Sequence, residues 1–107
     1  MAKRIVLSPE FLYELEELLE VLVEKQYFSS LSWALEYIDS IEKFIEQSLG
    51  TYPAKDMPCA LEKFGSYYIK YNHSKHTTWY IVFDETDDMF YVRHITNNHV
   101  SGQYFNF

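Results

Sequence analysis

The chain has 107 residues, 48% of them hydrophobic, and a formal net charge of −7. This length predicts one domain, 1–107, and the scarcity of Gly and Pro argues against a disordered or fibrous chain. Its single cysteine, Cys59, excludes an intramolecular disulfide, and neither a signal peptide nor a membrane-spanning apolar run is found, so a cytoplasmic protein is expected.

A short apolar run, Arg4–Leu7, predicts an opening strand that ends at a helix start signal. Ser8 is a favourable N-cap, Pro9 suits the first helical position, and Glu10 meets the positive end of the helix dipole. Apolar residues then recur every three or four positions as far as about Lys25, with glutamates on the opposite side. This period predicts an amphipathic helix.

A second amphipathic helix is expected after a break at residues 26–30. It begins near Ser30 or Ser32, presents an apolar side that includes Trp33 and Ile38, and ends at Gly50. So short a link predicts that the two helices pack antiparallel. Neither helix can bury its apolar side against the other alone, so both require a sheet to pack on.

Three strands are predicted in the last third of the chain, after an irregular stretch over 51–64. Aromatic and β-branched residues dominate Tyr67–His73, Thr77–Asp84 and Met89–Asn97, and short polar turns join them. Such connections predict an antiparallel meander. Alternation places Trp79, Ile81 and Phe83 on one face of the sheet and Tyr80 and Val82 on the other.

The predicted fold class is therefore α+β, in the order β-α-α-β-β-β. An N-terminal strand precedes an antiparallel two-helix hairpin, and a three-stranded antiparallel meander follows it. We expect one face of the sheet to lie under the helices. The other face is expected to be partly covered or used for binding.

This order of elements resembles the RelE/ParE superfamily of type II toxin–antitoxin toxins, which includes plasmid stabilisation proteins. The second strand in that family carries a Gly-x-Tyr-Arg-apolar-x-Tyr pattern, which Gly65, Tyr67, Ile69 and Tyr71 match with shifted spacing and without the arginine. The run Ile95–His99 is similar to the end of the family's last strand, where apolar residues give way to functional polar ones. The resemblance covers nearly the whole chain.

The resemblance implies a protein that inhibits growth by acting on an essential target and that a cognate antitoxin neutralises. The target would be DNA gyrase or another protein, bound without catalysis, or the ribosome and its mRNA, cut by an endonuclease of RelE type. An inactive relic that only binds antitoxin is the third possibility. Family toxins are usually basic, whereas residues 10–47 here hold ten acidic and two basic side chains, which favours the non-enzymatic binder.

If the chain is an enzyme, the resemblance implies a metal-independent mRNA endoribonuclease. Cleavage by internal transfer requires a base, a cation for the phosphate and an acid, for which His and Lys or Arg are suited. The candidates on the sheet and tail are Lys70, Arg93, His94, His99 and Tyr104, and the predicted catalytic set is Lys70, Arg93, His99 and Tyr104. Strand alternation places Arg93 and His94 on opposite faces, so at most one of these two is expected in any site.

No cofactor, metal or small-molecule substrate is predicted. The pair His73 and His76 lies in a turn without an evident third ligand, which favours a solvated loop over a metal site. Cys59 is expected to be a free, partly buried thiol. The run Asn97–His99 is either a polar site element or a turn in which Asn tolerates a left-handed backbone. The apolar tail, residues 103–107, either folds back or contributes to a partner-binding surface.

Overall fold

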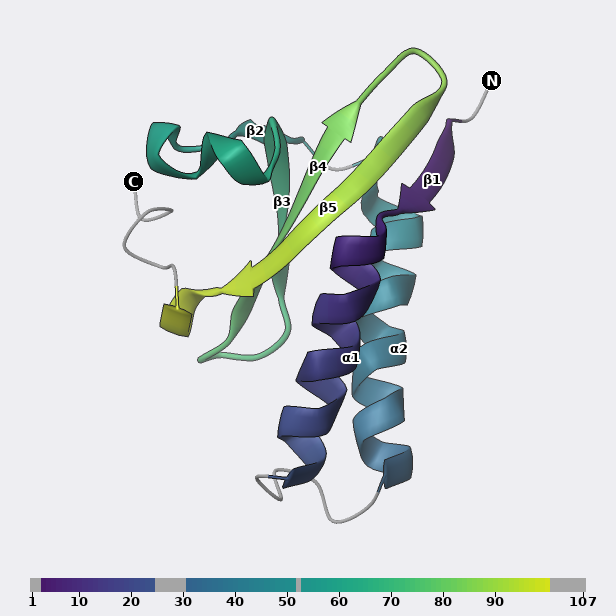
Figure 1. Ribbon diagram of the computed structural model, residues 1–107, viewed down its shortest axis with the longest axis vertical. Coiled ribbons are helices and arrows are strands. Elements are labelled where there is room, and N and C mark those ends of the chain that lie inside the picture. Colours follow the sequence, from purple (N-terminus) through teal and green to yellow (C-terminus); the bar gives the residue numbers. More distant parts are fainter. Residues whose placement is uncertain (1–2, 25–30, 52, 101–107) are drawn as a thin grey trace.

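The computed structural model describes residues 3–24, 31–51 and 53–100 (Figure 1). Two helices lie side by side against one sheet, so the predicted α+β class is confirmed. In chain order the elements are β1 (Arg4–Leu7), α1 (Pro9–Glu24), α2 (Leu31–Ser48), β2 (Lys55–Asp56), the 3₁₀ helix η1 (Cys59–Phe64), β3 (Tyr67–Asn72), β4 (Thr78–Glu85) and β5 (Met89–Asn97).

The sheet has five strands in the order β1-β5-β4-β3-β2. The predicted meander is present, because β3 pairs antiparallel with β4, and β4 pairs antiparallel with β5. The opening strand β1 pairs parallel with β5, with Arg4 opposite Met89 and Leu7 opposite Val92. The two-residue strand β2, which the sequence did not predict, pairs antiparallel with β3 at the other edge.

Helix α1 begins after Ser8 and helix α2 is followed by Gly50, as the sequence predicts. The Phe11 N–H donates to Ser8 Oγ at 3.0 Å, so Ser8 caps α1. The Ser8 N–H donates to the Val92 carbonyl at 2.9 Å, and this bond ties the start of the helix to β5. After α2, Gly50 has a φ of 85°, a backbone conformation that suits glycine and ends the helix.

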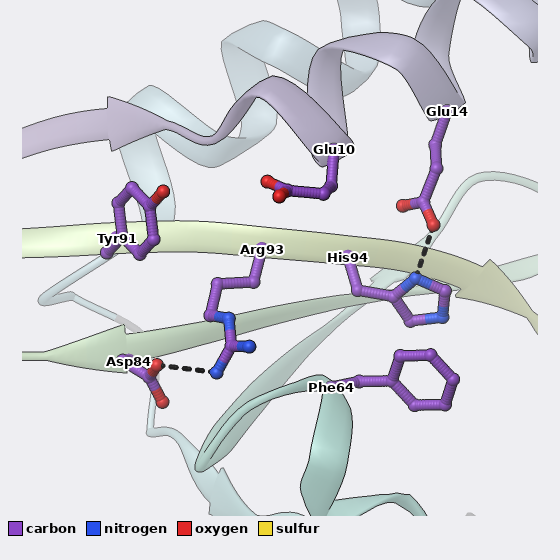
Figure 2. Close-up of a pocket in the computed structure, with 7 residues that line it drawn as sticks. All are labelled: Glu10, Glu14, Phe64, Asp84, Tyr91, Arg93 and His94. Atoms are coloured by element: carbon purple, nitrogen blue, oxygen red, sulfur yellow. Dashed lines mark hydrogen bonds and ion pairs between the residues drawn. The ribbon is translucent and has the colours of Figure 1, made fainter.

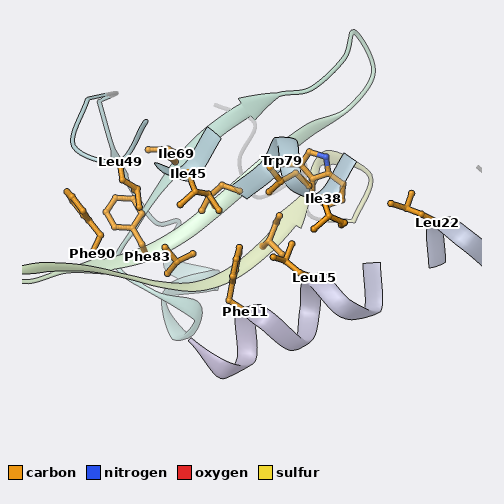
Figure 3. Packing of buried hydrophobic residues seen from close by; sticks show 14 of the residues in the cluster. Phe11, Leu15, Leu22, Ile38, Ile45, Leu49, Ile69, Trp79, Phe83 and Phe90 are labelled. Atoms are coloured by element: carbon orange, nitrogen blue, oxygen red, sulfur yellow. The ribbon is translucent and has the colours of Figure 1, made fainter. Parts of the chain in front are cut away.

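The main core lies between the helices and the inner face of the sheet, as predicted from the apolar spacing (Figure 3). Phe11 and Leu15 of α1 and Ile38 and Ile45 of α2 point into it. Its other buried members are Leu22, Ala34, Ile41, Leu49, Ile69, Trp79, Ile81, Phe83, Phe90, Val92 and Ile95.

The outer face of the sheet carries a second, smaller cluster. Tyr68, Tyr80 and Val82 are buried there together with Met57, and Leu61 and Phe64 of η1 pack against them. The segment that precedes β3 therefore covers part of this face. Within the described ranges, no helix is both long enough and apolar enough to span a bilayer.

Candidate functional site

A β-bulge in β5 changes which side chains share the outer face. Val82 lies opposite His94, whereas the next residue of β4, Phe83, lies opposite Val92. Arg93 is the extra residue between them, so the alternation of side chains is interrupted there. The expectation that Arg93 and His94 lie on opposite faces was wrong, because both line one pocket on the outer face (Figure 2).

This pocket, called the outer pocket below, has a volume of about 380 Å³. It lies where α1 passes the edge of β5 beyond the end of β1, and η1 closes its far side. Its walls combine three carboxylates, a guanidinium, an imidazole and two aromatic rings, contributed by Glu10, Glu14, Phe64, Asp84, Tyr91, Arg93 and His94.

Glu14 and His94 form the best-defined contact of the outer pocket. Glu14 Oε2 lies 2.6 Å from His94 Nδ1, and Glu14 Oε1 accepts the Ile95 N–H at 3.0 Å. A carboxylate only accepts, so His94 Nδ1 is the donor. Phe64 stacks on the imidazole with ring centroids 4.2 Å apart. Glu14 thus binds a backbone group of β5 beyond the reach of β1, and His94 is held from two sides.

Asp84 and Arg93 form a second ion pair in the same pocket. Arg93 Nη1 donates to Asp84 Oδ2 at 3.0 Å, and the Ser66 N–H donates to Asp84 Oδ1 at 2.9 Å. Burial by itself would raise the pKa of Asp84, but the hydrogen bonds from Ser66 and Arg93 outweigh burial and lower that pKa below its usual value. Asp84 therefore stays ionised and compensates the charge of Arg93.

The charges of the outer pocket oppose the binding of a phosphate. Three carboxylates face one guanidinium and one imidazole, and both of these groups are already paired with an acid. The side chains of Arg93 and His94 also point apart, the first toward Asp84 and the second toward Glu14 (Figure 2). The carboxylates around them repel a polyanionic substrate.

Of the three predicted catalytic residues that the structure describes, only Arg93 lines the outer pocket. Lys70 lies opposite Tyr80 on β4, which in turn lies opposite Thr96. Two strand spacings and three residue steps therefore separate Lys70 from Arg93, roughly 10 Å in each direction. Lys70 instead lines a separate hollow with Pro53 and Lys55.

His99, the third of these described residues, lies apart from both Lys70 and Arg93. His99 is exposed, and its Nε2 lies 3.4 Å from Thr77 Oγ1 at the turn that precedes β4. It therefore lies beyond the end of β5, away from Arg93. Tyr104 lies outside the described residues.

The two asparagines beside His99 have evident structural roles. Asn97 Oδ1 accepts the N–H groups of His99 and Val100 at 2.9 and 3.1 Å. Asn98 accepts the Thr78 N–H at 3.0 Å and donates to the His76 carbonyl at 3.0 Å. These contacts join the end of β5 to the turn between β3 and β4, in agreement with the turn reading of this segment.

The structure also places Cys59 and His73. Cys59 is exposed at the start of η1, so the expectation of a partly buried thiol was wrong. The ring of His73 stacks on Tyr37 with centroids 4.2 Å apart. Among the described residues, no group of three or more His, Cys, Asp or Glu side chains is arranged to hold a metal.

A second candidate site is the solvent side of the helices. Nine large hydrophobic side chains are exposed in the described part of the chain, and seven of them lie on α1 and α2. We call these seven the hairpin surface: Leu12, Tyr13, Val21, Val23, Leu31, Trp33 and Leu35. The prediction that the apolar sides of both helices are core was wrong for Leu12 and Trp33, which are 48 and 59% exposed.

No family model, curated protein or solved structure matches the chain. Its class is therefore defined by its own elements, two helices on a largely antiparallel five-stranded sheet. On this fold the outer pocket and the hairpin surface are the two regions whose composition requires a functional explanation.

Proposed function

We propose that this chain is the toxin of a type II toxin–antitoxin pair and that it acts in the cytoplasm. It inhibits growth by binding an essential protein, and a cognate antitoxin neutralises it. The proposal starts from the resemblance of the element order to the RelE/ParE superfamily. The choice of a binding mechanism over catalysis depends on the two candidate sites.

The hairpin surface is the observation that carries the proposal. Seven large apolar side chains on two adjacent helices remain in contact with water, although the same helices bury a full apolar side against the sheet. Exposed apolar side chains close together on a protein surface are typical of interaction sites.

The distribution of the candidate catalytic groups supports the same mechanism. Lys70, Arg93 and His99 lie in three separate places, and the charge of Arg93 is compensated by Asp84. A nuclease requires its cation and its acid–base groups around one phosphate. The described residues therefore favour binding over RNA cleavage.

Induced expression in a bacterial host tests the proposal, with growth and transcript integrity followed together. The wild type is compared with a hairpin variant, Trp33→Asp/Leu35→Asp, and a sheet variant, Lys70→Ala/His99→Ala. We expect the wild type and the sheet variant to arrest growth with intact transcripts, and the hairpin variant to permit growth. Circular dichroism of the purified variants establishes that each is folded.

Two other outcomes would contradict the proposal. Cleaved transcripts in cells that express the wild type would establish the endonuclease instead. Absence of arrest from a folded wild type would reject the toxin assignment and leave an antitoxin-binding relic as the remaining reading.

A ribosome-dependent mRNA endonuclease of RelE type is the second candidate function. The observation that favours it is the outer pocket, where the bulge brings Arg93 beside the Glu14–His94 pair. Under this alternative, Arg93→Ala/His94→Ala restores transcript integrity while Lys70→Ala/His99→Ala does not. Under the binding mechanism, neither double variant alters transcripts.

A further inference from the structure

The flanks of α1 have different neighbours. Helical geometry of about 100° per residue places Leu12, Leu19 and Val23 in one row, about 160° around the helix from Glu14. Glu14 faces the edge of β5, where it binds His94 and the Ile95 N–H. The leucine row of α1 therefore lies on the flank turned away from that edge.

The two flanks of helix α2 also have different neighbours. Leu31 and Leu35 are one turn apart, and about 150° separates them from the flank that carries Tyr37 and Phe44. Tyr37 accepts a hydrogen bond from Trp79 of β4 at 2.9 Å, and Phe44 stacks on a tyrosine of β3 at 4.5 Å. That flank faces the β3 side of the sheet, so Leu31 and Leu35 lie on the flank directed toward α1.

The two rows consequently face each other where α1 and α2 run side by side (Figure 1). We call this line the interhelical seam: Leu12, Leu19 and Val23 of α1 with Leu31 and Leu35 of α2. The two helices do not close the seam, because Leu12, Val23, Leu31 and Leu35 are 48, 42, 55 and 49% exposed. Leu19 packs partly against the core and forms the floor.

Carboxylates accompany both rows. The same geometry places Glu16 and Glu20 beside the leucine row of α1 and Asp39 and Glu46 beside the row of α2, whereas Glu42 lies in line with that row beyond Leu35. Glu42 and Glu46 also line a hollow with Ile5 and Leu7 of β1. Burial, followed by the negative charges of Asp39 and Glu46, raises the pKa of Glu42. Among the described residues, Lys43 pairs with Asp39 at 3.0 Å. The seam is an apolar line with predominantly negative charge along both sides.

We infer that the seam receives a basic amphipathic helix of the partner protein. Such a helix presents apolar side chains at three- and four-residue spacing to the exposed leucines, and Lys or Arg at its flanks to the carboxylates. A second copy of the chain does not fit, since it would bring like charges together along the whole contact. The inference rests on the proposed function and specifies the chemistry of the partner.

A synthetic peptide tests the inference without knowledge of the natural partner. The probe is a labelled helical peptide of about 18 residues, long enough to span the seam, with Leu at three- and four-residue spacing and Lys at the flanks. Its binding to the full chain is followed by fluorescence anisotropy. One control peptide has the same composition in scrambled order, and another has Glu in place of Lys. We expect saturable binding of the first peptide only.

A matched pair of variants locates the contact. Leu35→Asp and Trp33→Asp introduce the same charge at two exposed apolar positions of one helix, but about 160° separates these positions around α2. We expect Leu35→Asp to weaken binding about tenfold, the loss that follows from one poorly buried apolar contact. Trp33→Asp should change it less than about twofold, the effect expected of a position outside the contact.

Salt provides a third readout, because carboxylates exposed at the rim are screened over about 8 Å at physiological ionic strength. Binding should therefore weaken as NaCl is raised. Equal binding of the scrambled peptide, or equal effects of the two variants, would overturn the inference. So would a dimer in sedimentation equilibrium that Leu35→Asp dissociates, since the seam would then bind a second copy.

The inference and the proposed function fail separately. Growth arrest that Leu35→Asp abolishes, combined with no affinity for the Lys-flanked peptide, would retain the function and reject the basic helix. Peptide binding that shows the expected variant pattern in a chain that causes no arrest would retain the seam as a binding site and reject the toxin assignment.

Discussion

The two faces of the sheet are built from different interactions. The inner face meets two helices and buries mostly apolar side chains in one continuous cluster. The outer face is covered over part of its length by η1, and beside that small cluster it holds two ion pairs. Burial of apolar area depends little on direction, whereas hydrogen bonds and ion pairs depend strongly on geometry.

The two faces of the sheet therefore have different roles: one mainly provides stability, and the other positions specific polar groups. The inner face supplies the apolar burial that keeps the chain folded. The outer face places a few polar groups at defined distances and contributes less to the free energy of unfolding. Substitutions on the two faces should therefore differ in size, and the following four predictions are arranged from the largest effect to the smallest.

Phe11→Ala should cause the largest loss of stability. Phe11 is fully buried in the main core, so its truncation removes a large apolar contact and leaves a cavity, at a cost of about 3–5 kcal/mol. Urea denaturation measures the loss, with the exposed neighbour Leu12→Ala as the control. A loss for Phe11→Ala below that of Leu12→Ala would show that the inner face does not carry the stability.

Gly65→Ala tests how closely the polypeptide approaches the outer face before β3. A Cβ at this position would lie 2.6 Å from Val82 Cγ1, so the backbone must shift at a cost of about 1–3 kcal/mol. Thermal unfolding provides the measurement, and Glu62→Ala in the exposed part of η1 is the control. Equal stability of the two variants would mean that the backbone at Gly65 is not in close contact with Val82.

Glu14→Gln should have a smaller effect, confined to the outer pocket. The amide oxygen can still accept the Ile95 N–H, but the charged contact with His94 is lost, which costs about 1–2 kcal/mol. Glu20→Gln, on the solvent side of the same helix, is the control for the loss of one negative charge. If the two substitutions were equivalent in urea denaturation, the Glu14–His94 contact would contribute nothing measurable.

Asp84→Asn should mainly change how steeply the melting temperature falls at acidic pH. The folded-state pKa of Asp84 is lowered from 3.8, so its ionised form stabilises the protein above that pH and the contribution is lost as pH falls through the lower folded pKa. Melting temperatures between about pH 5 and 2 should therefore fall less steeply for Asp84→Asn than for the wild type. Parallel curves would show that Asp84 gains no net stabilisation from Arg93.

The inner face and the helix ends could be predicted from the sequence because their causes are local. Apolar spacing along each segment identifies the core side of a helix or strand without knowledge of its partner. Ser8 caps α1 and Gly50 ends α2 through contacts or backbone angles within a few residues. The alternation of Trp79, Ile81 and Phe83 held because the extra residue of the bulge lies in β5 and leaves β4 regular.

The outer pocket could not be predicted, since its geometry depends on pairing between distant segments. The bulge at Arg93 is defined by the register of two strands, and no local pattern in β5 marks it. Glu14 reads as one more glutamate on a solvated helix, yet it binds His94, 80 residues away in the chain. Lys70 was assigned by residue type alone, and β4 separates it from β5.

The parallel pairing of β1 with β5 has a consequence for the biosynthesis of the protein. Arg4 pairs with Met89, so the first strand to leave the ribosome has no partner until the last strand has been translated. The helices likewise wait for β4 and β5 before their apolar sides can be covered. Such distant closure makes folding slow, and the nascent chain exposes the apolar sides of its helices to chaperones throughout that interval.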